Sequence, residues 1–260
     1  MCMTNLRDTK IKMGTLKDFF EENKKIALGF SGGVDSVYLL FAAKKYGADV
    51  RAYFVKTPFQ PEFEYNDAVK AAQLVGVELN VIELDILLYE TVVANSENRC
   101  YCCKRHIFNA ICSRAAADGL GVIIDGTNAS DNADERPGMR ALKELEVRSP
   151  LRECGLTKAD IRRLSKDAGL FTWNKPSYAC LATRIPTGER ITRELLGKIE
   201  KSEDVLFELG FSDFRIRYFH GAARIQLRDF EMQKALEKRA EIIEQLQPYF
   251  SDIFIDIRSR

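Results

Sequence analysis

The sequence predicts an α/β protein in which a doubly wound parallel sheet precedes a smaller α+β domain. Over the first two thirds of the chain, strand-like apolar runs alternate with helix-like runs, an order that builds a parallel sheet covered by helices. After about residue 185 the pattern changes, and two alternating runs meet at a short turn. The segment 173–190 is rich in Pro, Gly and basic residues, so we interpret it as a linker. We therefore expect one domain over residues 1–185 and a second over residues 186–260.

Four strands are expected in the first domain, each a short run rich in apolar residues. They span residues 25–30, 50–56, 78–84 and 121–125. The last run is almost wholly apolar, which is typical of a central strand in a parallel sheet. The helices that alternate with these strands are expected over residues 37–46, 64–75, 104–118 and 157–168. The last three are followed by glycine, where helices commonly end, and Thr157 is also the expected N-cap of the last of them.

The second domain is expected to have the element order α-β-β-α-β. Its elements are a helix over residues 192–209, strands over 214–219 and 223–227, a strongly charged helix over 229–246 and a strand over 253–257. Thr192 is the expected N-cap of the first helix, and Gly210 lies at its end. His220-Gly221 is the expected hairpin turn between the first two strands.

Composition and charge narrow the class of protein. The chain is 46% hydrophobic and 30% charged, as in an ordinary soluble globular protein. Its net charge of +1 gives no general attraction to nucleic acid or membrane surfaces. No apolar run approaches membrane-spanning length, and the polar residues 1–12 do not resemble a secretion signal. We therefore expect a cytoplasmic protein whose cysteines are catalytic, metal-binding or inert rather than disulfide-bonded.

One run of small residues, Ser31-Gly32-Gly33-Val34-Asp35-Ser36, lies between the first strand and the first helix. Free backbone N–H groups and the helix dipole favour an anion at such a position, and the two glycines allow the backbone to approach a phosphate. No Lys follows the glycines, which excludes the Gly-x-x-x-x-Gly-Lys loop of kinases and GTPases. The run resembles the PP-loop of ATP pyrophosphatases, which split ATP into AMP and pyrophosphate to adenylate a substrate. The alternative is a strand-to-helix turn without a ligand.

Five of the six residues of this loop have an expected role in binding ATP. The backbone amides of Gly32 and Gly33 and the hydroxyls of Ser31 and Ser36 would hold the β,γ-phosphates. Asp35 would bind Mg²⁺, because carboxylate oxygens are preferred ligands of this ion. The alternative for Asp35 is an acid in the first helical turn, which the helix dipole favours without any metal.

A second polar loop, Asp125-Gly126-Thr127-Asn128, follows the last strand of the first domain. Ligands of parallel sheets bind beyond the carboxyl ends of the strands, so this loop and the PP-loop are expected to face one pocket. We therefore expect Gly126, Thr127 and Asn128 to approach the nucleotide. An ordinary helix-capping turn is the alternative.

Three of the seven cysteines lie where they could share a chemical role. Cys100 and Cys103 have the Cys-x-x-Cys spacing at the start of a helix, and Cys180 lies in the linker. The helix N-terminus and the basic residues at 99, 104 and 105 are expected to lower the thiol pKa. A structural zinc ion would need a fourth ligand, and the sequence has no second Cys-x-x-Cys and no paired His. Three thiolates would suit an iron–sulfur cluster with one iron open to an external ligand; inert buried thiols are the alternative.

Taken together, the motifs resemble the LarE family, ATP-dependent sulfur-insertion enzymes in the synthesis of the nickel-pincer nucleotide, the cofactor of lactate racemase. The match spans nearly the whole chain and rests on residues 31–36, 98–104, 125–128 and 173–192, the last with Lys175-Pro176, Cys180-Leu181, Arg184-Ile185-Pro186, Gly188 and Ile191-Thr192. The resemblance implies that ATP adenylates a carboxylate of pyridinium-3,5-biscarboxylic acid mononucleotide. Sulfur then displaces AMP and gives the thiocarboxylate.

The family resemblance also implies where the sulfur comes from. In some members a single cysteine, matching Cys180, gives up its own sulfur in one turnover. In others three cysteines hold a 4Fe–4S cluster whose open iron carries the sulfide that is delivered. With Cys100, Cys103 and Cys180 this sequence resembles the second kind, although Cys102 could replace Cys103 as a ligand. The resemblance further suggests a homo-oligomer, and the sulfur donor that reloads the cluster is not encoded here.

The implied substrate carries a phosphate and carboxylates, so basic residues are expected to contact it. Arg184 is the first choice because it lies four residues from Cys180. For Arg215, Arg217 and Arg224, on or beside the second-domain hairpin, a solvated surface position is an equal alternative. Glu200 and Asp204 share a helix face and could bind a metal, although a solvated face is the commoner case. Trp173 could cover the site or pack in the core.

Three alternative functions each fit part of this pattern. A tRNA thiolase would use the same ATP chemistry, but it would need a basic RNA-binding face, which the net charge of +1 does not favour. A metal or redox carrier would leave residues 31–36 unexplained. An amide-forming synthetase would leave the three cysteines without a role.

Overall fold

The computed structural model describes residues 14–131 and 137–260, so the polar segment 1–12 lies outside the described residues. The larger sheet has four parallel strands in the order β3-β2-β1-β4. These are β1 (Lys25–Gly29), β2 (Asp49–Lys56), β3 (Leu79–Glu83) and β4 (Val122–Ile124). Each lies within the segment predicted for it or one residue from its end, and the α/β class with a parallel central sheet is confirmed.

The expectation that β4 is a central strand is wrong. Among the described residues, β4 pairs with β1 on one side and is extended on the other only by a single bridge between Ile124 and Arg148. Its apolar character has a different cause, because helices cover both of its faces. Ile124 is fully buried in the core on one face, and Ile123 packs against the core on the other.

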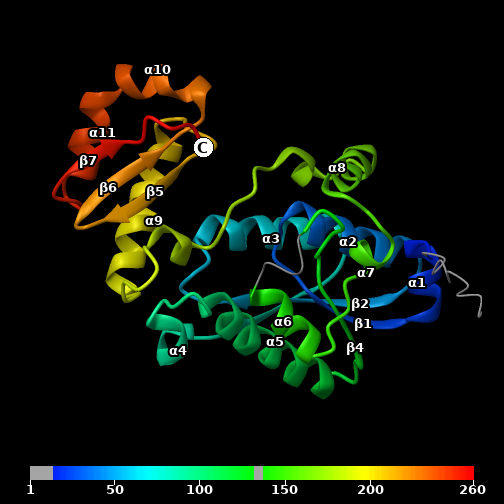
Figure 1. The fold of residues 1–260 in the computed structure, drawn as a ribbon. Coiled ribbons are helices and arrows are strands. Elements are labelled where there is room, and N and C mark those ends of the chain that lie inside the picture. The colour runs from blue at the N-terminus through cyan, green and yellow to red at the C-terminus, as the bar shows by residue number, and fades with distance from the viewer. Residues whose placement is uncertain (1–13, 132–136) are drawn as a thin grey trace, which may run out of the picture.

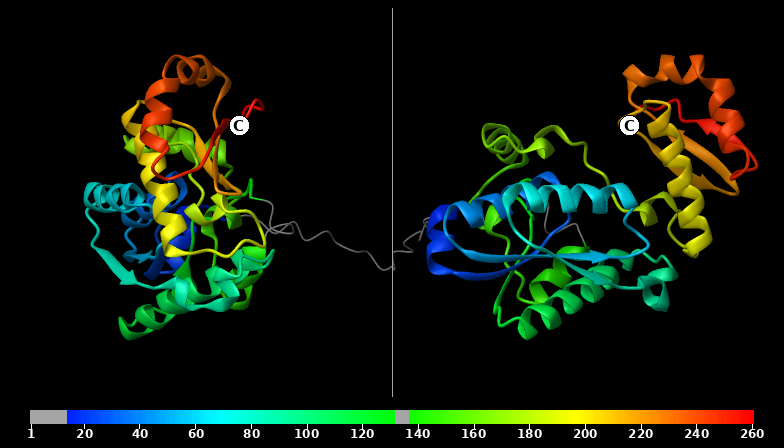
Figure 2. Two further views of the ribbon diagram at one scale, coloured as in Figure 1. Left: turned by 90° about the vertical axis from the view of Figure 1, so that its left-hand side faces the viewer. Right: turned by 180° about the vertical axis from the view of Figure 1, so that it is seen from behind.

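Helices cover both faces of the larger sheet (Figures 1 and 2). One face carries α2 (Val34–Lys45) and α3 (Glu62–Val75), with α8 (Lys158–Asp167) packed on α2; the other carries α5 (Arg99–Ala117) and α6 (Pro137–Glu144). Side chains alternate between the two cores, with Leu28 and Phe54 facing α2 and α3, and Ala27 and Tyr53 facing α5. The remaining short elements are α1 (Leu16–Glu22), α4 (Glu90–Val93), α7 (Pro150–Glu153) and the 3₁₀ turns η1 (Ile86–Leu88), η2 (Phe171–Asn174) and η3 (Leu181–Arg184).

Local sequence signals fix several helix ends. Thr157 caps α8, where its side chain accepts a hydrogen bond from the backbone N–H of Asp160, and the Asp160 carboxylate accepts one from the backbone N–H of Thr157. Gly76 ends α3 in the left-handed conformation, with φ of 71°. Helix α5 begins at Arg99 rather than at residue 104, so Cys100 and Cys103 both lie in its first turns.

The chain then builds a second, three-stranded sheet in the order β5-β6-β7. Its strands are β5 (Arg215–Phe219), β6 (Ala222–Gln226) and β7 (Ile253–Ile255), and its helices are α9 (Arg193–Glu208), α10 (Asp229–Glu237) and α11 (Arg239–Leu246). Strands β5 and β6 form the predicted hairpin, with His220 and Gly221 at φ of 49° and 90° in its turn. Thr192 caps α9 through the backbone N–H of Leu195, as predicted.

The expectation of one continuous helix over residues 229–246 is wrong. The helix is interrupted at Lys238, which both ends α10 and precedes α11. The interruption lets α11 turn back toward α9, so that Ile242 and Leu246 are buried in the second core. No glycine or proline marks this break in the sequence, because the cause is packing between distant segments.

Segments from both sides of residue 186 share one apolar core. The core under the second sheet includes Phe59, Ile86, Val92 and Leu181, which precede residue 186 in the chain. The boundary at residues 185 and 186 therefore stays a prediction.

None of the helices in the described ranges is both long and apolar enough to cross a lipid bilayer.

Candidate active site

The PP-loop is closed by its own hydrogen bonds. Ser36 Oγ donates to the carbonyl of Gly33 (3.2 Å) and accepts from the backbone N–H of Ser31 (3.3 Å). Gly32 has a φ of 71°, and a Cβ there would lie 2.9 Å from the Cα of Ala68 on α3. Only glycine fits this position, because both the backbone conformation and the close approach of α3 exclude a side chain.

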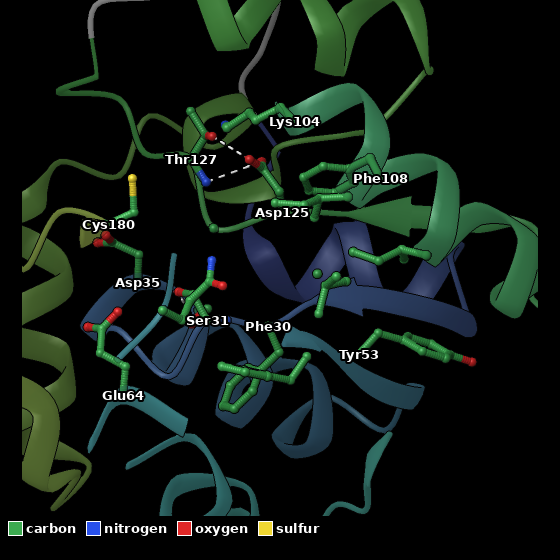
Figure 3. Close-up of a pocket in the computed structure, with 18 of the residues that line it drawn as sticks. Phe30, Ser31, Asp35, Tyr53, Glu64, Lys104, Phe108, Asp125, Thr127 and Cys180 are labelled. Atoms are coloured by element: carbon green, nitrogen blue, oxygen red, sulfur yellow. Dashed lines mark hydrogen bonds between the residues drawn. The ribbon is translucent and has the colours of Figure 1, made fainter. Parts of the chain in front are cut away.

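A cavity of about 400 Å³ opens at the carboxyl ends of β1 and β4 (Figure 3). The residues predicted for the site that line it are Ser31, Asp35, Ser36, Gly126, Thr127 and Cys180. Figure 3 shows Cys180, Asp35 and Glu64 along one side, with Thr127, Asp125 and Lys104 along another. The opposite end is apolar and is lined by Phe30, Tyr53, Phe54, Val55, Ile107, Phe108 and Ile111. The cavity thus joins a polar, phosphate-compatible end to an apolar wall that suits a planar base.

The loop after β4 lies directly against the start of α2. A Cβ on Gly126 would lie 3.0 Å from the backbone nitrogen of Ser36. Asp125 holds the loop in shape, because it accepts hydrogen bonds from the hydroxyls of Thr127 (2.5 Å) and Ser149 (2.6 Å). Asn128 is buried and caps the backbone N–H of Ser130, and it does not line the cavity. The two loops predicted to face one pocket therefore do so, through Gly126 and Thr127.

Asp35 offers one free oxygen. Its Oδ2 lies 2.6 Å from the Lys158 ammonium, whereas its Oδ1 is buried without a hydrogen-bond partner. Burial raises the pKa of this carboxyl, and Lys158 opposes the rise. A buried, unpartnered carboxylate oxygen beside the PP-loop fits a hard cation such as Mg²⁺.

The three cysteines are electrostatic neighbours. Burial raises the pKa of Cys103 to about 12, and the thiols of Cys180 and Cys100 add to the rise. Burial also raises the pKa of Cys180, against the pull of the Arg99 guanidinium. Arg99 is itself buried; it donates to the carbonyl of Ala182 (2.9 Å) and its Nη2 lies 3.7 Å from Cys100 Sγ. Arg99 therefore connects the helix that carries Cys100 and Cys103 to the turn that follows Cys180.

The structure bears on two expectations for these thiols, their pKa and their grouping as metal ligands. The expected lowering of the thiol pKa at the start of the helix is wrong for Cys103, because desolvation outweighs the helix dipole and the neighbouring basic groups. Within the described ranges, no three or more His, Cys, Asp or Glu side chains are grouped so that they could hold a metal ion. The three thiols are electrostatic neighbours but are not grouped around one metal position, so the ligand set Cys100, Cys103 and Cys180 stays a prediction.

Arg184 has a different environment from the one expected. Its side chain is fully buried, and its Nε and Nη2 donate to Glu203 at 2.8 and 3.1 Å. Nη1 donates to the carbonyl of Ala179 (2.8 Å), next to Cys180. Because these groups are engaged inside the protein, the structure supports a positioning role for Arg184 rather than contact with a substrate phosphate.

The hairpin arginines lie close to this buried pair. Arg215 has a buried Nε without a partner, and Arg217 donates to the carbonyl of Thr183 (2.7 Å). Burial and the neighbouring arginines lower the pKa of Arg215 and of Arg217, while Arg224 is paired with Asp256. This excess of positive charge near Cys180 favours an anion.

The remaining candidates lie elsewhere. Glu200 accepts a hydrogen bond from the backbone N–H of Glu62 at the start of α3 (2.9 Å), and burial and nearby acids raise the pKa of Asp204. Trp173 is 36% exposed beneath the Lys166 ammonium and does not line the cavity. Three charged residues line the cavity without having been predicted as ligands: Glu64, Lys104 and Asp131. Only Lys104 had a signal in the sequence, since it lies one helical turn after Cys100.

No family model matches the chain. It is 35% identical over 227 residues to an uncharacterized protein of Synechocystis sp., across 87% of this chain and 85% of that protein. It is 31% identical over 243 residues to an uncharacterized protein of Methanocaldococcus jannaschii, across 93% and 92% of the two chains. The chain belongs to the family of these two proteins.

The chain is also homologous to an enzyme whose reaction product is known from its name. The pyridinium-3,5-bisthiocarboxylic acid mononucleotide synthase of Lactiplantibacillus plantarum is 29% identical over 238 residues, across 91% of this chain and 86% of the enzyme. More distant similarity, over 58% and 59% of the chain, extends to an argininosuccinate synthase and a tRNA-specific 2-thiouridylase. The family resemblance drawn from the sequence motifs is thereby confirmed as homology to the LarE enzyme.

Proposed function

We propose that this protein is an ATP-dependent sulfurtransferase of nickel-pincer nucleotide synthesis. It adenylates a carboxylate of pyridinium-3,5-biscarboxylic acid mononucleotide and then replaces AMP by sulfur to give the thiocarboxylate. The observation that carries the proposal is a single cavity lined by PP-loop residues and by Cys180. The homologous synthase from L. plantarum supports the substrate class.

The PP-loop and the apolar wall supply the binding of ATP. Oxide is a poor leaving group, and transfer of AMP to the substrate carboxylate replaces it with a good one. The backbone amides of Gly32 and Gly33, with the hydroxyls of Ser31 and Ser36, hold the β,γ-phosphates as charge develops on them. Asp35 holds Mg²⁺ through its free oxygen. Thr127 and Gly126 line the nucleotide from the opposite loop.

The cysteines supply the sulfur step. Cys100, Cys103 and Cys180 would hold a 4Fe–4S cluster, which would supply an exchangeable sulfide. Each thiol must lose its proton to bind iron, and burial opposes that loss at Cys103 and Cys180. Cluster loading is therefore expected to release protons. Donation of sulfur from Cys180 itself is the alternative outcome, and it would leave Cys100 and Cys103 without a role.

The hairpin arginines bind the substrate phosphate. Arg215 and Arg217 lie on β5, near the turn that Arg184 and Glu203 hold beside Cys180. An anion at this position would relieve the repulsion among the guanidinium groups and give the buried Nε of Arg215 a partner. The mononucleotide phosphate is the group of the substrate that fits this demand.

The test is anaerobic purification of the wild-type protein and of Cys180→Ala. Iron and acid-labile sulfide in cluster proportion, reduced in the variant, are the expected result, with AMP, pyrophosphate and thiocarboxylate formed from ATP and substrate. Protein without iron that loses the mass of one sulfur atom per turnover would favour sacrificial donation by Cys180. Absence of pyrophosphate release with the carboxylate substrate would contradict the proposed function.

A further inference from the structure

Asn95 lies in the connection between α4 and α5, in a backbone conformation that residues other than glycine rarely adopt. Its φ is 54°, in the left-handed region, which Asn enters more readily than most residues because its short polar side chain forms local hydrogen bonds. Only 1% of the residue is exposed. A buried polar residue keeps such a conformation only where its surroundings hold it there, so its contacts indicate what it does.

The side chain of Asn95 binds the segment that follows η3. Its Nδ2 donates to the carbonyls of Pro186 (2.7 Å) and Glu189 (3.0 Å), and the carbonyl oxygen of Ile185 lies 3.4 Å from the same nitrogen. The backbone carbonyl of Asn95 accepts a hydrogen bond from the backbone N–H of Gly188 (2.9 Å). One buried residue therefore holds the turn 185–189 through both its side chain and its backbone.

The same side chain orients Arg99, the first residue of α5. Asn95 Oδ1 accepts a hydrogen bond from Arg99 Nη1 (2.5 Å), and that nitrogen also donates to the carbonyl of Ala182 (2.9 Å). Arg99 Nη2 lies 3.7 Å from Cys100 Sγ. Because Ala182 lies two residues after Cys180, Asn95 and Arg99 together bridge the two segments that carry the cysteines.

From these contacts, and resting on the proposed sulfur transfer, we infer that Asn95 is a positioning residue for the Cys180 thiol. It sets where Cys180, at the start of η3, lies relative to Cys100 and Cys103 on α5. Asn95 does not line the cavity, and both polar atoms of its side chain are engaged by the protein. The PP-loop is closed by hydrogen bonds of its own residues. Loss of the Asn95 amide is therefore expected to impair sulfur transfer and to leave adenylation intact.

Asn95→Gly tests this role, because glycine adopts the same φ without strain and removes the amide. The reaction is followed in single turnovers, with oxygen-free protein in excess of ATP and with the biscarboxylic acid mononucleotide and sodium sulfide present, so that adenylation and sulfur transfer are measured as separate steps. Pyrophosphate release should stay within about twofold of the wild-type rate. Thiocarboxylate formation should fall about 10- to 100-fold, since a misplacement of about 1 Å between reacting groups can slow a reaction about 100-fold.

Asn98 supplies matched controls from the same connection. Its side chain is exposed and makes no capping hydrogen bond with α5, so Asn98→Gly should leave both rates near those of the wild type. Asn95→Asp keeps one acceptor oxygen but sets a second oxygen against the carbonyls of Pro186 and Glu189, so it should also impair sulfur transfer. Asn98→Asp makes the same change of side chain closer in the chain to Cys100. A difference between the two Asp variants therefore reports the contacts of Asn95 rather than added charge.

Hydrogen–deuterium exchange of the substrate-free protein supplies a readout that does not depend on activity. The backbone N–H groups of Gly188 and Ile191 donate to the carbonyls of Asn95 and Val93. Asn95→Gly should speed exchange over residues 185–191 by about tenfold or more and leave exchange over the PP-loop, residues 31–36, unchanged. A purely structural role predicts faster exchange throughout the larger sheet and parallel loss of both products. If Asn95→Gly does not fold, Asn95→Asp is compared with Asn98→Asp in the same two measurements.

The outcomes that overturn the positioning role differ from those that overturn the proposed function. Thiocarboxylate formed by Asn95→Gly at the wild-type rate, or unchanged exchange over residues 185–191, would refute the role of Asn95 while the proposed function still stood. Unfolding of both Asn95 variants, or loss of both products together, would show a general structural role and refute it too. A wild-type protein that releases no pyrophosphate would refute the proposed function, and the exchange comparison would still show whether Asn95 holds the turn 185–189.

Discussion

Arg184 and Glu203 form a buried ion pair that ties the Cys180 segment to α9. Two guanidinium nitrogens of Arg184 reach the two oxygens of Glu203, and both side chains are almost fully buried. Glu203 also accepts hydrogen bonds from the Tyr178 hydroxyl and from the backbone N–H of Ile216 on β5. The carboxylate thereby fixes residues on both sides of Cys180 relative to the second sheet.

Removal of one partner of this pair is expected to destabilise the protein strongly. Glu203→Ala should lower the free energy of unfolding by about 3–5 kcal/mol, because it leaves the Arg184 charge buried and unpaired. Replacement of both partners, Arg184→Met with Glu203→Leu, should restore most of the loss. Urea unfolding measures these changes. Glu90→Gln is the control, since its pair with Arg190 is 68% and 60% exposed and solvent screens the attraction between the two charges.

Glu64 makes stability depend on pH in a defined window. Its carboxyl keeps its proton up to about pH 7 in the native state, against 4.5 for an exposed group, because burial outweighs the attraction of Lys175 and Arg184, and Asp67 adds repulsion. The native state therefore binds more protons than the unfolded state between these pH values. The free energy of unfolding falls as pH rises through that window and is independent of this group above it.

Glu64→Gln tests this dependence, because the amide keeps the shape and has no charge. At about 1.4 kcal/mol per pH unit, the variant should gain about 3 kcal/mol relative to the wild type as pH rises from 4.5 to 7. Urea unfolding of both proteins at several pH values measures the difference. A constant difference across the window would show that Glu64 titrates normally.

Gly126→Ala is expected to weaken nucleotide binding. The added Cβ would lie 3.0 Å from the backbone nitrogen of Ser36, so the loop must move away from α2. Because ATP binding must restore the position of the loop, this overpacking cost of about 1–3 kcal/mol corresponds to a loss of ATP affinity of about 5- to 150-fold, measured by calorimetry. Gly121→Ala is the control, since a Cβ there meets nothing within 4 Å. Equal affinities of the two variants would contradict the packing argument.

The sequence predicted those features that depend on neighbouring residues. The PP-loop, the N-caps Thr157 and Thr192 and the His220-Gly221 turn are each set by a few consecutive residues, and the structure has all of them. The order of strands and helices followed from hydrophobic patterning. These signals were sufficient for the α/β class and for the meeting of two loops at one edge of the sheet.

Features that depend on distant residues were not predictable in this way. Lys158 lies 123 positions from Asp35 in the chain, so no local pattern connects them. The burial of Arg184 against Glu203 and the raised thiol pKa of Cys103 likewise arise only when separate elements pack. The edge position of β4 and the break at Lys238 have the same origin.

The central claim is that one cavity carries out adenylation and sulfur delivery as separate steps. The most direct measurement is substrate-dependent release of pyrophosphate, with thiocarboxylate measured in the same reaction, for Asp35→Asn and Cys180→Ala. We expect Asp35→Asn to slow both products at least about tenfold, and Cys180→Ala to release pyrophosphate without forming thiocarboxylate. Thiocarboxylate formed at the wild-type rate by Cys180→Ala, or pyrophosphate released at the wild-type rate by Asp35→Asn, would contradict the claim.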